Sequence, residues 1–171
     1  MLRTRVGYAG GSTVDPTYHD LADHTEAFQI DFDPSLLSYA ALLDEIWANR
    51  RGGRSYDRQY MEAVFCFDEV QESAARERGI TAPIISGARF YLAEDYHQKY
   101  HLRHDSLLTR ELADYSPRQL IDSTVAARLN GYVAGRGSIA RLRDELASFE
   151  LSAAAAAHLE RLVAHRGGTH L

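Results

Sequence analysis

Four side chains that can bind an oxygen or move a proton crowd the amino end of the sequence. Tyr8, Tyr18, His24 and Glu26 fall in the stretch TRVGYAGGSTVDPTYHDLADHTE, residues 4–26. A carboxyl group that is partly desolvated and touched by phenol hydroxyls has a raised pKa and can donate a proton near neutral pH. The same residues also suit a structural role, in a Pro-Thr-Tyr turn and at the entrance of a strand. The residue types alone leave both interpretations open.

A strand and a helix follow this cluster and are expected to position it. The segment AFQIDF, residues 27–32, alternates apolar and polar side chains, which is typical of a half-buried strand. Apolar residues then recur from Tyr39 to Trp47 with the spacing of one helical face. We expect this helix to cover the sheet that begins at the strand.

The middle of the chain predicts shorter elements. Residues 49–59 contain breakers and no periodicity, so they predict an exposed loop that leads into a strand over 60–67. Residues 68–78 predict a short helix, and 84–93 predict extended chain interrupted at Gly87. The segment 94–105 suits a helix or helical turn.

The sequence after Tyr115 favours helices. Ser116 followed by Pro117 predicts a helix start, and apolar residues from 120 to 129 keep helical spacing. Ser138 and Ser152 can cap two more helices. We therefore predict a first domain over 1–114 and a helical carboxyl-terminal extension over 115–171.

Composition excludes several classes of function. The chain has 171 residues, a net charge of -5 and no basic block, which argues against nucleic acid as a partner. The single Cys66 excludes an intramolecular disulfide framework and favours a cytoplasmic location. A polar start and the lack of a long apolar run argue against secretion and membrane insertion.

Several motifs occur in the order, and near the spacing, of one enzyme family. They are GYAGG (7–11), PTY (16–18), DHTE (23–26), QY (59–60) and FYLAEDYHQKY (90–100). With them the chain resembles the A-type peptide methionine sulfoxide reductases over residues 4 to about 104. The resemblance implies a mixed α/β fold with a ferredoxin-like sheet, here lacking its first strand and helix. It also implies reduction of the S epimer of methionine sulfoxide, with thioredoxin restoring the enzyme and no cofactor.

The resemblance assigns roles to individual residues. It implies that Glu26 protonates the sulfoxide oxygen and that the hydroxyls of Tyr18 and Tyr60 bind it, which suits an oxygen that leaves only when protonated. We assign Tyr8 and the residues His24, Asp57 and His97 as further substrate-binding positions. Two places depart from the family pattern: the loop at 50–53, whose residues differ from those of the family, and Asp23.

The nucleophile of the family has no counterpart in the expected place. The family's Gly-Cys-Phe-Trp motif lies before the position of Thr4, where this sequence has only Met1, Leu2 and Arg3. Cys66 is expected about 20 Å beyond Tyr60 on one strand, too far to replace it. We therefore expect a cysteine-less relative that binds a small polar ligand or performs acid/base chemistry, without thioredoxin as partner. The alternatives are an ordinary reductase in an amino-terminally shortened chain, and a non-catalytic interaction module.

Two further expectations concern assembly and metal binding. Without its first strand the family's sheet would have open edges, to be covered by the carboxyl-terminal helices, by a homodimer or by a segment outside this chain. His97, His101 and His104 would share one helical face and could bind zinc, but no cysteine completes a ligand set. We therefore predict no metal site and a structural role for these histidines.

Overall fold

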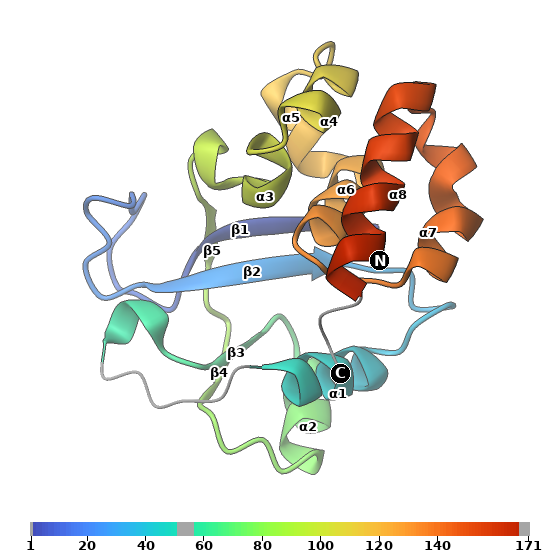
Figure 1. Cartoon of the computed structure of the whole chain (residues 1–171). Coiled ribbons are helices and arrows are strands. Elements are labelled where there is room, and N and C mark those ends of the chain that lie inside the picture. The colour runs from blue at the N-terminus through green and yellow to red at the C-terminus, as the bar shows by residue number, and fades with distance from the viewer. Residues whose placement is uncertain (1, 51–56, 168–171) are drawn as a thin grey trace. The chain divides into compact units, whose positions relative to one another are not determined.

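The computed structural model describes residues 2–50 and 57–167, and it shows a mixed α/β chain with small sheets and helices toward the carboxyl end (Figure 1). The fold class expected from the sequence is thereby confirmed. Two compact units divide the chain, one over Met1–Glu94 and one over Asp95–Leu171. The domain boundary expected between residues 114 and 115 stays a prediction.

The first unit contains a three-stranded antiparallel sheet in the order β2-β1-β5. The strands are β1 (Arg3–Ala9), β2 (Thr25–Asp31) and β5 (Phe90–Leu92). β1 pairs with β2 along its whole length, and Figure 1 shows the two strands side by side. The strand expected over 27–32 is therefore confirmed as β2. The patterns above do not predict β1, because arginines and a glycine, which is depleted in strands, interrupt its apolar residues.

A parallel βαβ unit completes the first unit. It consists of β3 (Val64–Cys66), α2 (Glu69–Glu77) and β4 (Ile84–Ser86), and β3 pairs with β4 in parallel. The helix expected after residue 38 is confirmed as α1 (Tyr39–Asn49), whose cap Ser38 accepts a hydrogen bond from the Ala41 amide. Four buried residues from these elements form a small core: Leu43, Val64, Cys66 and Ala75.

The strand expected over 60–67 is wrong in its extent. Residues Arg58–Tyr60 form the 3-10 helix η1, and β3 does not begin before Val64. The Asp57 carboxylate accepts a hydrogen bond from the Gln59 amide, and this cap stabilises a turn instead of extended chain. Tyr60 and Cys66 therefore do not lie on one strand, and the distance of about 20 Å expected from that premise has no basis.

The second unit is helical. Its elements are η2 (Asp95–His97), α3 (Tyr100–Arg103), α4 (Ser106–Glu111), α5 (Pro117–Asp122), α6 (Thr124–Val133), α7 (Ile139–Glu145), η3 (Leu146–Phe149) and α8 (Ala153–Gly167). Ser116, Ser138 and Ser152 accept hydrogen bonds from helical amides, as their positions predict. The single helical spacing from 120 to 129 is divided at Ser123, which is extended and caps α6.

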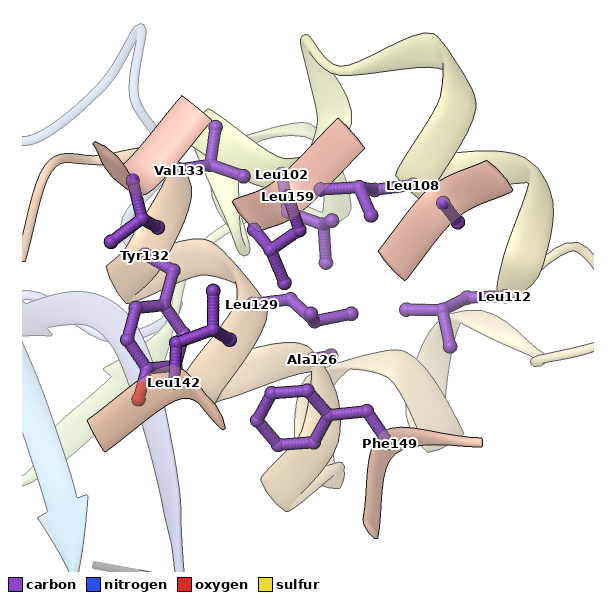
Figure 2. Packing of buried hydrophobic residues seen from close by; sticks show 12 residues of the cluster. Leu102, Leu108, Leu112, Ala126, Leu129, Tyr132, Val133, Leu142, Phe149 and Leu159 are labelled. Carbon is purple, nitrogen blue, oxygen red and sulfur yellow. The ribbon is translucent and has the colours of Figure 1, made fainter. Parts of the chain in front are cut away.

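One continuous core fills the second unit. Twelve buried residues pack together, and Figure 2 shows Leu129, Leu142 and Leu159 pointing toward one another from α6, α7 and α8. The helices that supply these side chains are short, so their packing rather than their intrinsic propensity stabilises them. A helix able to span a membrane does not occur in the described part of the chain.

Candidate functional site

The pairing of β1 with β2 positions the first members of the candidate site. Tyr8 on β1 lies directly opposite Glu26 on β2. Cross-strand partners of an antiparallel pair project to the same face of the sheet. Tyr8 is buried, whereas Glu26 is exposed to solvent. The sheet therefore presents a carboxyl group to solvent beside a buried phenol.

Glu94 attaches the Pro-Thr-Tyr turn to this sheet. The Tyr8 hydroxyl donates to Glu94 Oε2 at 2.7 Å, and the Tyr18 amide donates to Glu94 Oε1 at 2.9 Å. An isolated bridge between Thr17 and Asp20 closes the turn itself. Glu94 uses both carboxylate oxygens and so fixes the backbone that carries the Tyr18 side chain. Tyr8 is buried, and its assignment as a substrate-binding residue stays a prediction.

His24 supports the glycine-rich loop. Its ring is fully buried, Nδ1 accepts a hydrogen bond from the Gly11 amide at 3.2 Å, and Nε2 lies 2.9 Å from the Thr13 carbonyl oxygen. The ring approaches Gly11 so closely that a Cβ there would lie 2.3 Å from the imidazole. Both nitrogens are thus engaged with backbone groups, and a substrate-binding role of His24 stays a prediction.

Arg58 attaches η1 to the loops around β2. Its guanidinium donates to the carbonyl oxygens of Asp23 at 3.0 Å and Gly10 at 3.1 Å. The Thr25 hydroxyl in turn donates to the Arg58 carbonyl oxygen at 2.9 Å. These three bonds hold η1, and with it Tyr60, against the start of β2.

Glu26, Tyr18 and Tyr60 converge at this place. Gln59 Nε2 donates to Glu26 Oε1 at 2.6 Å, which orients the carboxyl group. The charge of Glu26 raises the pKa of the Tyr60 hydroxyl, with smaller contributions from burial and from the nearby Tyr18 and Asp57. Tyr18 is 40% exposed and Tyr60 is 53% exposed, so a ligand can reach both rings. The arrangement offers two phenol donors and one carboxyl group to a polar oxygen.

Asp57 and His97 are the remaining predicted site residues. Asp57 caps η1 and contributes charge near Tyr60. His97 belongs to the second unit, where its ring packs against Tyr96 with centroids 4.1 Å apart. Its assignment as a substrate-binding residue stays a prediction, because the geometry of the first unit does not include it.

The histidines near His97 have local partners. His104 Nδ1 lies 2.7 Å from the Tyr100 carbonyl oxygen, and the His101 ring meets the Tyr100 ring edge to face. Among the residues for which the structure gives positions, no group of three or more histidine, cysteine, aspartate or glutamate side chains is placed to hold a metal ion.

Cys66 lines an apolar cavity beside the site. The cavity measures about 340 Å³ and is lined by residues of β2, α1 and β3, among them Glu26. The thiol is buried and lies 3.9 Å from the Tyr39 hydroxyl. Burial raises the pKa of Cys66, more than its contact with Tyr39 lowers it. This environment disfavours the thiolate form of Cys66.

Sequence reasoning does not assign Gln59 and Glu94 to the site. Gln59 belongs to the Gln-Tyr motif and Glu94 to FYLAEDYHQKY, so both lie within motifs of the family pattern. The local sequence suggests for Glu94 only a contact with His97 or a capping role. Motif membership is the available signal, because Glu94 is 76 residues from Tyr18 and local patterns cannot show that contact.

Comparison with known proteins extends these observations. A family model described as peptide methionine sulfoxide reductase matches residues 1–128. A second, described as the helical domain of selenoprotein methionine sulfoxide reductase A, matches residues 116–158.

Curated relatives come from distant organisms. A peptide methionine sulfoxide reductase of Drosophila melanogaster is 42% identical over 165 residues, which cover 89% of this chain and 67% of the relative. Peptide methionine sulfoxide reductase A5 of Oryza sativa subsp. japonica is 34% identical, with 78% of this chain and 59% of the relative covered. MsrA of Azotobacter vinelandii is 38% identical, and the match covers 57% of this chain and 56% of the relative. The chain therefore spans between about half and two thirds of these relatives.

Proposed function

Since the chain belongs to the peptide methionine sulfoxide reductase family, we propose that its first unit binds the S epimer of methionine sulfoxide at Tyr18, Glu26 and Tyr60. The convergence of these three side chains at the start of β2 supports the proposal most directly. A sulfoxide oxygen is a strong hydrogen-bond acceptor, and two exposed phenols beside a carboxyl group match it.

The three side chains have different roles in binding the sulfoxide oxygen. The hydroxyls of Tyr18 and Tyr60 donate to it, and the Glu26 carboxyl group is placed to hydrogen-bond it and, where a nucleophile attacks the sulfur, to protonate it. Gln59 holds the carboxyl group in place through its amide. Glu94 does not contact the oxygen itself; it fixes the turn that carries Tyr18.

Reduction requires a nucleophile that attacks the sulfur, and Cys66 is the one thiol among the 171 residues. Its burial and raised pKa make the thiolate scarce at neutral pH. We therefore propose that this chain alone binds the sulfoxide without reducing it. A single cysteine also forms no intramolecular disulfide for thioredoxin to reduce.

Calorimetric titration with a peptide that contains one methionine S-sulfoxide tests the proposal. Tyr18→Phe and Tyr60→Phe each remove one donor and should weaken binding about threefold to tenfold. Tyr115→Phe, which changes an exposed tyrosine of the second unit, is the matched control and should change nothing. Glu26→Gln removes the carboxyl group and should also weaken binding.

A turnover assay with excess dithiol separates the alternatives. Binding without reduction agrees with the proposal. Reduction that disappears in Cys66→Ser would contradict it and would identify an unusual reductase. Reduction that appears only in a longer version of the chain would favour the ordinary reductase. Binding in none of the assays would favour a non-catalytic interaction module.

A further inference from the structure

The connection between β1 and β2 carries Tyr18, and we call its residues 10–24 the Tyr18 loop (Figure 1). Main-chain pairing of the two strands ends where this loop begins. The whole loop lies in the described part of the chain, and within it Pro16 and His24 are the buried residues. Because apolar packing involves so few of its residues, hydrogen bonds must determine much of its conformation.

Two side chains close the Tyr18 loop at its base. The Gly11 amide donates to His24 Nδ1 at 3.2 Å. One position further into the loop, the Ser12 amide donates to Asp23 Oδ1 at 2.8 Å, and the Ser12 hydroxyl donates to the same oxygen at 3.2 Å. These contacts continue the connection between the two chain segments after their main-chain pairing has ended.

The contact of Asp23 with Ser12 depends on a residue that departs from the family pattern, so membership of the family does not predict it. The hydrogen bond from the Ser12 amide lowers the pKa of the Asp23 carboxyl group, and desolvation, which acts in the opposite direction, does not outweigh it. A hydrogen bond from an amide to an ionised carboxylate is stronger than one to a neutral acceptor. The ionised form of Asp23 therefore favours the closed loop.

The backbone beside Asp23 has a conformation that other contacts must support. Ala22 has a φ of 49°, and Asp15 in the same loop has a φ of 51°. Residues with a Cβ rarely adopt this left-handed region. Such conformations persist where surrounding contacts hold them, and they concentrate at functional sites. The bond from Ser12 to Asp23 lies directly next to Ala22 and can hold it.

The tip of the loop is fixed separately from its base. Glu94 accepts a hydrogen bond from the Tyr18 amide, and a main-chain bridge closes the turn around it. We propose that Asp23 is a positioning residue, which closes the base of the Tyr18 loop through Ser12 and so orders Tyr18 before a ligand arrives. A side chain that is ordered in advance loses less conformational entropy on binding. The role of Tyr18 in binding a sulfoxide rests on the proposed function.

Two substitutions of Asp23 test the closure of the loop. Asp23→Ala removes the acceptor, whereas Asp23→Asn removes the charge but keeps an oxygen that can accept from the Ser12 amide. Hydrogen exchange of this amide, measured by NMR, should become about threefold to tenfold faster in Asp23→Ala and change less in Asp23→Asn. The amides of β1 and β2 should keep their protection, which shows that both variants fold. Unchanged exchange at Ser12 in Asp23→Ala would overturn the proposal.

Titration with the peptide that contains one methionine S-sulfoxide tests the effect on binding. Asp23→Ala should weaken binding about threefold to tenfold, and Asp23→Asn should keep most of the affinity. Asp20→Ala removes another exposed carboxylate of the loop but leaves its main-chain bridge with Thr17, so it should bind like the unaltered chain. Equal losses in Asp23→Ala and Asp23→Asn would attribute the effect to charge and contradict the proposal.

A double substitution tests whether Asp23 acts through Tyr18. Ordering of Tyr18 brings no advantage when its hydroxyl is absent, so Asp23→Ala should have little further effect on binding in a Tyr18→Phe chain. A general structural effect of Asp23→Ala would instead weaken binding by the same factor with and without that hydroxyl. This result would overturn the positioning role.

Amide exchange and peptide binding separate this inference from the proposed function. If the unaltered chain does not bind the sulfoxide peptide, the proposed function fails, whereas faster exchange in Asp23→Ala would still support the closure of the loop by Asp23. If Asp23→Ala exchanges faster but binds the peptide as tightly as the unaltered chain, the proposed function stands and the positioning role of Asp23 is overturned.

Discussion

The two compact units bury their apolar residues in different ways. The second unit has one cluster of twelve buried residues contributed by helices from α3 to α8 (Figure 2). The buried cluster of the first unit has four residues and lies beside a cavity of about 340 Å³. A close-packed core specifies one arrangement, whereas an apolar cavity leaves room for a ligand. The comparison associates binding with the first unit and packing with the second.

A leucine-to-alanine substitution in each core should show the largest difference in stability between the two units. Leu159→Ala truncates a fully buried side chain of α8 inside the twelve-residue cluster, and Leu43→Ala truncates a buried side chain of α1 that already lines the cavity. Loss of a leucine side chain costs about 2–5 kcal/mol, and the cost grows with the void that remains. We expect Leu159→Ala in the upper half of this range and Leu43→Ala in the lower half.

Two spectroscopic signals measure the stability of the two units separately. Trp47 is the one tryptophan of the chain and lies in the first unit, so its fluorescence follows that unit during urea unfolding. Far-ultraviolet circular dichroism is dominated by the helices, most of which are in the second unit. Leu36→Ala, at a residue that is 83% exposed, should change neither signal and serves as control. Equal costs of the two core substitutions would contradict the comparison.

A glycine in each unit offers a second, smaller contrast. A Cβ on Gly11 would lie 2.3 Å from the buried His24 ring, so Gly11→Ala must displace that ring and its two backbone contacts. We expect a loss of about 1–3 kcal/mol in the Trp47 signal. A Cβ on Gly131 in α6 would meet no atom of the described residues within 4 Å, and Gly131→Ala should stabilise the helix by about 0.5–1 kcal/mol. A neutral Gly11→Ala would mean that the loop adapts freely.

The elements that local patterns predict well are those that local forces determine. The serines before α5, α7 and α8 cap their helices because a side-chain oxygen and a nearby amide suffice for the contact. The alternation of residues 27–32 predicts the strand β2 correctly, although the apolar Phe28 in it is 58% exposed and does not face the interior. The motifs likewise identified Tyr18, Glu26 and Tyr60, which the structure brings together.

The parts that sequence reasoning missed depend on contacts between distant residues. Glu94 joins Tyr8 and Tyr18 across 86 and 76 positions, and no local period predicts such a partner. The strand predicted over 60–67 wrongly includes Tyr60, because Asp57 caps a turn there. The sequence patterns do not predict the cavity, since residues far apart in the chain, from β2, α1 and β3, line it together.

The smallest expected effect concerns the charge on Asp105, which links two helices of the second unit. Asp105 caps α4 by accepting from the amides of Leu107 and Leu108, and its Oδ2 lies 2.7 Å from His158 Nε2 on α8. Burial by itself would raise the pKa of this carboxyl group, but the bonds from His158 and the two amides outweigh burial and lower it. A carboxyl whose pKa is lower in the folded state stabilises the fold above its unfolded pKa. That contribution is lost as the pH falls through the folded pKa.

Asp105→Asn isolates this charge, because asparagine keeps the capping oxygen. The variant should be about 1 kcal/mol less stable at neutral pH, and the difference should shrink below about pH 4 as the unaltered carboxyl gains its proton. Urea unfolding followed by circular dichroism at several pH values measures both quantities. Asp114→Asn, at an exposed position of the same unit, is the matched control. A difference that stays constant with pH would show that the amide geometry, and not the charge, joins α4 to α8, so that the second unit would depend on packing alone.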